Sequence, residues 1–189
     1  MDLMTAIKER RSCRNFSNEP VASDVIENIL EAATWAPSPL NAQPWSFVVI
    51  TSNDKKNEIF AEAERSREEA IQKSGWAWLG KYSVDFLLSA PAIIAVAGDP
   101  KKSGVDQFME GGARGYEHAC AAAVQNMMLT AHALGVGSVW FTLFDRDKLQ
   151  GILNLGSDKV PLALVCLGKI AADPAPTPRK GFGDKTTYL

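Results

Sequence analysis

The most informative parts of this sequence are two stretches near its start, Arg10-Arg11-Ser12-Cys13-Arg14-Asn15-Phe16 and Pro37-Ser38-Pro39-Leu40-Asn41-Ala42-Gln43-Pro44-Trp45. The first stretch concentrates positive charge in a chain whose formal net charge is -2. The second stretch is stiffened by prolines and carries several hydroxyl and amide side chains.

The arginine stretch allows two interpretations. It could be the solvated end of a short helix, because cations are favourable near a helix C-terminus. Alternatively, the guanidinium groups and the Ser12 hydroxyl converge on a phosphate dianion. Three or four charge-assisted hydrogen bonds of about 1.5–3 kcal/mol each would supply much of the roughly 8 kcal/mol that micromolar affinity requires. The spacing alone leaves both interpretations open.

The proline-rich stretch presents its polar side chains from a backbone with little freedom left to lose. Asn41 and Gln43 each carry a donor and an acceptor, which suits the edge of a planar heteroaromatic ring. The alternative is a rigid loop that leads into a strand, with Trp45 in the core. Phosphate and a heteroaromatic ring occur together in FMN, whose flavin edge alternates carbonyls with an N–H group.

The composition is that of one ordinary globular domain. The chain has 189 residues, of which 46% are hydrophobic and 22% charged. The small net charge argues against nucleic acid or an anionic membrane as a partner. Three distant cysteines without CxxC spacing argue against disulfides and zinc, and they fit a reducing cytoplasm. The first residues lack the features of a signal peptide, and the longest uncharged run (119–134) is short for a bilayer span.

Hydrophobic periodicity predicts a single α+β domain. Apolar spacing and caps indicate helices, whereas runs of β-branched and aromatic residues indicate strands. The run 92–97 is continuously apolar and predicts a strand buried on both faces. The residues 99–113 are expected to form a loop. The predicted helices are 2–10, 23–35 with Ser23 as N-cap, a charged helix ending near 73, 76–89, 114–134 and 145–153; the predicted strands are 45–51, 92–97, 139–143 and 162–167.

Some features remain open at the level of sequence. Trp76, Trp78 and Tyr82 have a spacing typical of core residues, but they could equally cover a flat aromatic substrate. His132 is expected to be packed or hydrogen-bonded rather than a metal ligand, since His118 is 14 residues away and no acidic cluster completes a site. Prolines at alternate positions after 171 predict an extended C-terminal tail.

Taken together, the motifs resemble the FMN-dependent nitroreductase family. They read R-R-S-x-R-x-F, then P-S-x-x-N-x-Q-P-W, then A-L-G-x-G-S-x-W over 133–140, followed by a basic tail. The resemblance implies an α+β fold with a mostly antiparallel or mixed sheet of about four strands flanked by helices. It further implies an intertwined homodimer, in which the tail (170–189) of a single domain (1–189) wraps the partner and adds a strand to its sheet.

The resemblance also implies a role for individual residues. Arg10 and Ser12 would hold the FMN phosphate with Arg11 beside them, and Arg14 would approach the N1/O2 side of the flavin ring. Thr142 and Leu143 would face flavin N5 and O4 with backbone N–H groups, although many relatives have glycine at the position of Leu143. The other expected FMN contacts are the second subunit's loop, contributing Pro37, Ser38, Pro39, Asn41 and Gln43, and the tail residues Arg179 and Lys180.

The implied activity is that of an FMN oxidoreductase. A hydride from NADH or NADPH would pass to flavin N5, and two electrons would then pass to a nitroaromatic, a quinone or a similar small-molecule acceptor by a ping-pong mechanism. The flavin carries this chemistry, so no catalytic side chain and no metal are expected. Two alternatives remain open: reductive dehalogenation or a specialised dehydrogenation on the same fold, and a flavin-binding module without turnover.

Overall fold

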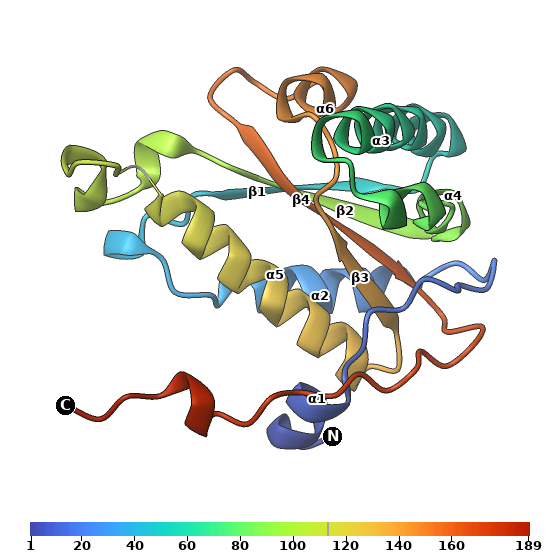
Figure 1. Ribbon diagram of the computed structural model, residues 1–189, viewed down its shortest axis with the longest axis horizontal. Helices are drawn as coiled ribbons and strands as arrows, with labels where there is room; N and C mark the ends of the chain where they lie inside the picture. The colour runs from blue at the N-terminus through green and yellow to red at the C-terminus, as the bar shows by residue number, and fades with distance from the viewer. Residues whose placement is uncertain (113) are drawn as a thin grey trace.

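The computed structural model describes residues 1–112 and 114–189 and contains one four-stranded antiparallel sheet. The strands are β1 (Trp45–Ile50), β2 (Ala92–Gly98), β3 (Gly137–Phe141) and β4 (Val160–Gly168), in the order β1-β2-β4-β3 (Figure 1). Each neighbouring pair is antiparallel. The expected α+β fold with about four strands is confirmed, and within this sheet the pairing is antiparallel throughout.

Helices cover both faces of the sheet (Figure 1). One face carries α2 (Ser23–Thr34) and the long α5 (Gly115–Ala133). The other carries α3 (Asn53–Ser74), α4 (Phe86–Ser89) and α6 (Arg146–Ile152). The short α1 (Leu3–Glu9) lies outside these layers, near the C-terminal end of α5.

The hydrophobic core is split by the sheet into two clusters. Along β2, Ile93 and Ala95 belong to the cluster beneath α3, α4 and α6, whereas Ile94 and Val96 belong to the cluster beneath α2 and α5. This alternation follows from the two-residue repeat of a strand. All seven residues of β2 are buried, as the apolar run predicted. The central strand therefore provides a rigid base for the segments at the edge of the sheet.

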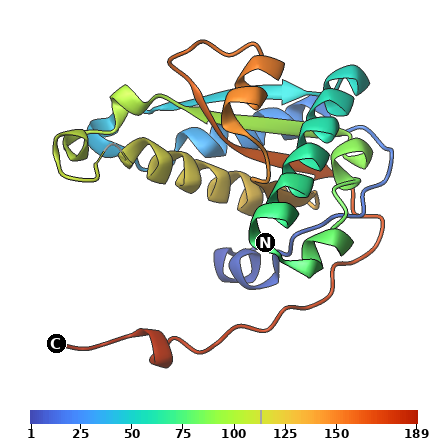
Figure 2. The same cartoon turned by 45° about the horizontal axis from the view of Figure 1, so that its top comes forward.

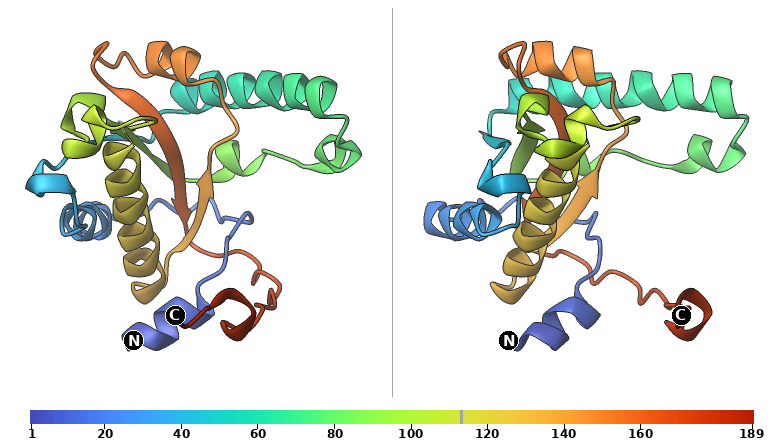
Figure 3. Two further views of the ribbon diagram at one scale, coloured as in Figure 1. Left: turned by 60° about the vertical axis from the view of Figure 1, so that its left-hand side comes forward. Right: turned by 90° about the vertical axis from the view of Figure 1, so that its left-hand side faces the viewer.

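The predicted helix over 76–89 is wrong. The segment contains a 3-10 helix, η2 (Ala77–Lys81), and the single turn of α4, with no helix between them. The Ser83 hydroxyl accepts from the Asp85 N–H (3.0 Å) and donates to the Asp85 carboxylate (2.6 Å). Such local side-chain bonds compete with helix formation and turn the chain here. In Figure 3, η2 and the end of α3 project together beyond the sheet.

Two smaller predictions also need correction. The predicted strand 139–143 begins at Gly137 and ends at Phe141, because the Phe144 N–H donates to the Thr142 carbonyl oxygen (3.1 Å) in a turn. Ser23 is the first residue of α2 rather than its N-cap, a position that Ala22 occupies without a side-chain bond. Because β3 ends at Phe141, Thr142 and Leu143 lie just after this edge strand.

The segment 99–112 is only partly irregular. It contains two 3-10 helices, η3 (Pro100–Lys102) and η4 (Val105–Phe108), while position 113 of the predicted loop lies outside the described residues. The Asp106 carboxylate accepts from the Gly115 N–H (2.6 Å) at the start of α5. This bond ties the segment to the first turn of the central helix.

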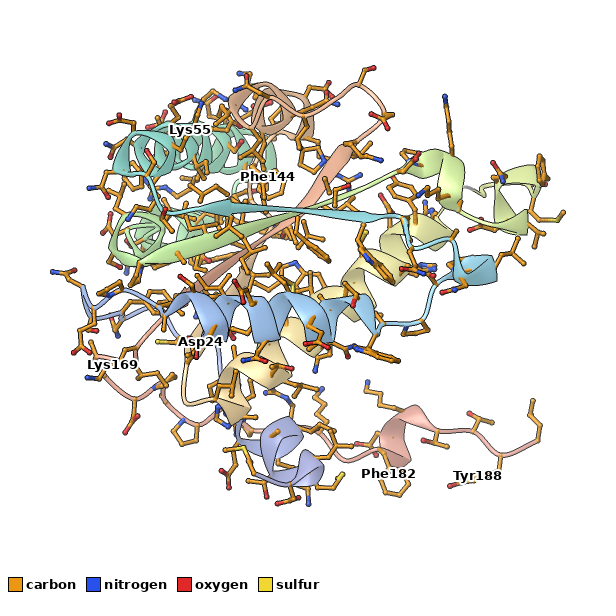
Figure 4. The ribbon with its side chains drawn as sticks, turned by 180° about the vertical axis from the view of Figure 1, so that it is seen from behind. Asp24, Lys55, Phe144, Lys169, Phe182 and Tyr188 are labelled. Carbon is orange, nitrogen blue, oxygen red and sulfur yellow. The ribbon has the colours of Figure 1, made fainter. Side chains whose placement is uncertain are left out.

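After β4 the chain runs in an extended tail with one short helical turn, η5 (Gly183–Lys185). Figure 2 shows the tail separated from the body over most of its length. The Phe182 and Tyr188 side chains lie along this outer part (Figure 4) and are 77% and 86% exposed. No helix in the described part of the chain is long and apolar enough to cross a membrane.

Candidate functional site

The backbone of the arginine segment, residues 10–16, is tied to the end of the sheet. The Cys13 N–H donates to the Ser138 carbonyl oxygen (2.9 Å) at the start of β3. The Ala171 N–H, just beyond β4, donates to the Asn15 carbonyl oxygen (3.0 Å). Phe16 forms a further bridge with Ile170. These bonds fix the segment between the two strand ends.

Burial decides which side chains of this segment point inward. Cys13 and Phe16 are buried in the core cluster beneath α3. The close approach needs a glycine, because a Cβ atom at Gly137 would lie 3.0 Å from the Cys13 Cβ atom. Burial raises the pKa of the Cys13 thiol. With these two residues directed inward, the arginines and Ser12 are left at the surface.

The arginine side chains line a cavity of about 560 Å³, which we call the arginine cavity. Arg179 of the tail reaches the same cavity, so a predicted residue from the far end of the sequence meets the first motif. No carboxylate of the described residues lines it. Its lining residues are Arg10, Arg11, Ser12, Arg14, Asn15, Ala172, Pro174, Ala175, Thr177 and Arg179.

Within the described part of the chain, none of the four arginines of the arginine cavity forms an ion pair. Arg11 Nη1 donates only to the backbone oxygens of Lys8 (2.6 Å) and Arg10 (2.8 Å). Burial, followed by the charges of Arg11 and Arg179, lowers the pKa of Arg10. Such a donor set fits a phosphate dianion, which would supply the missing negative charge.

Arg14 lies at the border of the arginine cavity. Its Cζ atom is 5.8 Å from the ring centroid of Tyr82 and 5.9 Å from that of Phe86, within the range of a cation–π contact. Arg14, Tyr82 and Phe86 also line a cavity of about 520 Å³ that borders the arginine cavity. Tyr82 in turn lines a third cavity. The three spaces are thus neighbours, linked by Arg14 and Tyr82.

The third space is an aromatic cavity of about 440 Å³ beneath η2. The rings of Trp76 and Trp78 stack at 5.9 Å and are 59% and 57% exposed, so the core interpretation of these tryptophans is wrong. Thr142 and Leu143 also line this cavity. Leu143 also packs against the core cluster, which draws part of its side chain away from the cavity.

The proline loop, residues 37–44, holds an unusual backbone around the 3-10 turn η1 (Pro39–Asn41). Leu40, Asn41 and Gln43 have φ values of 52°, 53° and 46°, in the left-handed region that non-glycine residues seldom adopt. The Ser38 hydroxyl accepts from the Gln43 N–H (3.1 Å), and Gln43 Nε2 donates to Asn41 Oδ1 (3.3 Å). Left-handed non-glycine residues often mark ligand-binding sites.

The proline loop and the arginine segment do not meet within one chain. The loop lies near the start of α5, whereas the arginine segment lies near its end (Figure 1). Pro39 packs against Gly104, where a Cβ atom would lie 2.5 Å from the Pro39 Cβ atom. None of the loop's predicted residues lines the three cavities described above. Lys180 is exposed and does not line the arginine cavity either.

Sequence reasoning missed several residues of the site. Asn15 and Thr177 line the arginine cavity, and Phe86 supports Arg14 together with Tyr82. Asn15 stands inside the first motif and could have been considered as a lining residue. Nothing in the spacing of Phe86 and Thr177 indicates their role. Among the described residues no group of metal-ligating side chains assembles.

Comparison with known proteins identifies the family of the chain. The family model described as "Nitroreductase family" matches residues 7–169. The protein belongs to the nitroreductase family. That match includes the arginine segment, the proline loop and all four strands.

Individual relatives carry several different names. A protein of Archaeoglobus fulgidus provisionally named NADH dehydrogenase/NAD(P)H nitroreductase is 32% identical, over 88% of this chain and 84% of its own. An iodotyrosine deiodinase of Haliscomenobacter hydrossis is 29% identical, over 84% of this chain and 75% of its own. Nitroreductase-family members therefore differ in their named reactions, and membership alone leaves the reaction open.

A solved structure has the same fold. The crystal structure of oxidized iodotyrosine deiodinase bound to FMN and 3-iodo-L-tyrosine superposes with a TM-score of 0.81. The two sequences are 22% identical, and the match covers 95% of this chain and 96% of the other. At this level of identity the match establishes the fold alone.

Proposed function

We propose that the protein is an FMN-dependent oxidoreductase that passes two electrons from NADH or NADPH to a planar aromatic acceptor. One observation carries the proposal: four arginines and a serine line one cavity that contains no carboxylate, and none of these arginines has an ion-pair partner in the described chain. Bringing these cationic side chains together costs free energy unless an anionic ligand in the cavity offsets their charge. Family membership and the FMN-bound relative support a flavin mononucleotide as that ligand.

The phosphate of FMN would bind Arg10, Arg11, Ser12 and Arg179. Arginine forks and a hydroxyl form short, strong bonds with phosphate oxygens. Arg14 would lie beside the ring, because it borders both the arginine cavity and the space that leads to Tyr82. A cation there stabilises the negative charge of a reduced flavin. Bound flavin supplies the hydride and electron transfer, so the chain itself binds and orients.

We infer that the proline loop completes the site of a second copy of the chain. This inference rests on the distance along α5 between the loop and the arginine segment of the same chain (Figure 1). Large apolar side chains around the loop are exposed, including Trp35 (80%), Leu40 (82%) and Phe108 (76%). An exposed set of this size is typical of a surface that another protein covers. In the homodimer the extended tail would wrap the partner.

The aromatic cavity is the proposed acceptor site. Its walls are rings and aliphatic side chains, with Lys73, Ser74 and Thr142 as the polar members. Stacked tryptophans favour flat, electron-poor molecules such as quinones and nitroaromatics. Donor and acceptor would use this space in turn, which predicts ping-pong kinetics.

The visible spectrum of the purified protein tests the proposal first. Flavin absorption bands, with FMN identified by mass after release, are expected. Oxidation of NADH or NADPH by the yellow protein in the presence of menadione or a nitrofuran then tests turnover. A protein that remains colourless in excess FMN contradicts the proposal, and a yellow protein inert with every donor and acceptor is a flavin-binding module instead.

A substitution in the aromatic cavity separates acceptor binding from flavin binding. Trp78→Ala removes one ring of the stack, and an aromatic pair contributes about 0.5–1.5 kcal/mol. We expect KM for menadione to rise about threefold to tenfold while FMN content stays unchanged. Trp78→Phe, which keeps a ring, should recover most of the loss. Unchanged KM in Trp78→Ala would place the acceptor elsewhere.

A further inference from the structure

A separate cavity of about 240 Å³ lies behind the arginine segment, between the end of α5 and the start of β3. We call it the histidine cavity. It shares Arg10, Arg11 and Pro174 with the arginine cavity, whereas His132 and Ser138 line only the histidine cavity. Glu9 and Asp173 also contribute to its lining, and both are exposed.

Buried polar atoms without a hydrogen-bond partner gather at this cavity. Among the described residues six side-chain atoms are in this condition, and four of them belong to residues of the histidine cavity. The four are Arg10 Nη1, Arg11 Nε, His132 Nε2 and Ser138 Oγ. Native proteins leave few such atoms, so a cluster of them calls for a specific occupant.

Ser138 is the most informative of these residues, because it is only 2% exposed. It lies in the edge strand opposite Leu167, and its carbonyl oxygen accepts from the Cys13 N–H. Its hydroxyl is left facing the cavity without a protein partner. His132 lies in the last turn of α5, and its Nε2 atom also has no hydrogen-bond partner.

The chemistry of the four groups selects the occupant. Guanidinium groups only donate hydrogen bonds, and a serine hydroxyl and a histidine can donate as well. An occupant must therefore present several acceptor atoms. We propose that the histidine cavity is a binding site for a small oxyanion, distinct from the site of the FMN phosphate.

Space and charge are consistent with this occupant. The volume of the cavity is several times the roughly 30 Å³ that one water molecule occupies in the liquid, so a tetrahedral oxyanion fits. In the described chain, Glu9 and Asp173 form no ion pair with Arg10 or Arg11. Their exposed carboxylates are screened by solvent and salt. An anion bound at this site would hold the two guanidinium groups from the side opposite the flavin phosphate.

The two histidines of the chain allow a direct test. The FMN-saturated protein is titrated with sodium sulfate, and the imidazole signals are followed by NMR. Sodium chloride at equal ionic strength is the control for screening. The variant His118→Gln leaves one imidazole signal and so assigns His132. Sulfate is chosen because it stays a dianion across the neutral pH range.

We expect a saturable shift of the His132 signal with sulfate and none with chloride, while His118 remains unaffected. The variant Ser138→Ala, which deletes the buried hydroxyl, should weaken sulfate binding about tenfold and keep its FMN. The variant His132→Gln, followed by calorimetry, should also bind sulfate more weakly than the His118→Gln control.

Two results would overturn the proposal. One is a His132 signal that does not saturate, or that follows ionic strength with either salt. The other is unchanged sulfate affinity in Ser138→Ala, which would place the anion outside the histidine cavity. Because His132 and Ser138 do not line the arginine cavity, the proposal does not rest on flavin binding, and a protein without FMN can be tested through the same signal.

Discussion

Arg65 on α3 and Arg10 in the arginine segment carry the same charged group in opposite surroundings. Arg65 Nε and Nη2 donate to the two carboxylate oxygens of Glu62 (2.8 Å each), and Nη1 donates to Glu69 (2.6 Å). These hydrogen bonds raise the pKa of Arg65. Arg10 is partly buried beside other arginines, and its pKa is lowered. Arg65 thus has carboxylate partners within the chain, whereas Arg10 has none among the described residues.

Stability and binding are therefore assigned to different parts of the molecule. The Glu62 carboxylate also accepts from the Asp145 N–H (3.0 Å) and from the Ser66 hydroxyl, which joins α3 to α6. The arginine segment forms no comparable side-chain network in the described chain; backbone bonds hold it, and none of its guanidinium groups pairs with a carboxylate. Substitutions in the two regions should have separable effects.

The largest effect is expected for Arg10→Ala. Loss of one or two charge-assisted bonds to the phosphate should lower FMN affinity by about tenfold to a hundredfold. Thermal stability of the flavin-free protein should hardly change, since Arg10 has no carboxylate partner. The measurement is quenching of FMN fluorescence, with Lys8→Ala as a matched control that removes a nearby exposed cation. Full retention of FMN affinity in Arg10→Ala would rule out its phosphate role.

The opposite pattern is expected for Glu62→Gln. Breaking this buried network should reduce the free energy of unfolding by about 1–3 kcal/mol and leave FMN affinity unchanged. Burial alone would raise the pKa of Glu62, but the hydrogen bonds from Arg65, Asp145 and Ser66 outweigh it and lower the pKa below 4.5. This stabilisation is present above that value and is lost as the pH falls through the lowered pKa. In urea unfolding between pH 7 and pH 3, the free energy of unfolding should therefore fall less steeply with pH in the variant than in the native protein.

A smaller but more specific effect tests whether a site combines two chains. Arg10→Ala and Asn41→Ala should each bind FMN poorly alone. When the two variants are expressed together, about a quarter of all sites receive an intact arginine segment and an intact proline loop. FMN content should recover to that fraction. No recovery in proven mixed dimers would mean that the loop does not serve the partner's site.

Most of the fold could be predicted from the sequence, because β1 and β2 are runs of β-branched and apolar residues, α2 has an apolar stripe, and α5 is long and nearly uncharged. The prediction failed at 76–89, where the Ser83 hydroxyl bonds locally with Asp85 and the chain is not helical between η2 and α4. It also did not indicate the left-handed backbone of Leu40 and Gln43, since neither residue type favours that region. The prediction that Arg179 lies close to the arginine segment came from the family resemblance. The cluster around Ser138 depends on tertiary packing and has no sequence signature.

Comparison of FMN with riboflavin tests the central claim most directly, because the two molecules differ only in the phosphate. Titration of the flavin-free protein should show FMN binding at least about a hundredfold more tightly than riboflavin, reflecting the charge-assisted bonds to the arginine cavity. In Arg10→Ala this preference should shrink by at least about tenfold. Equal affinities for the two flavins in the native protein would contradict the account.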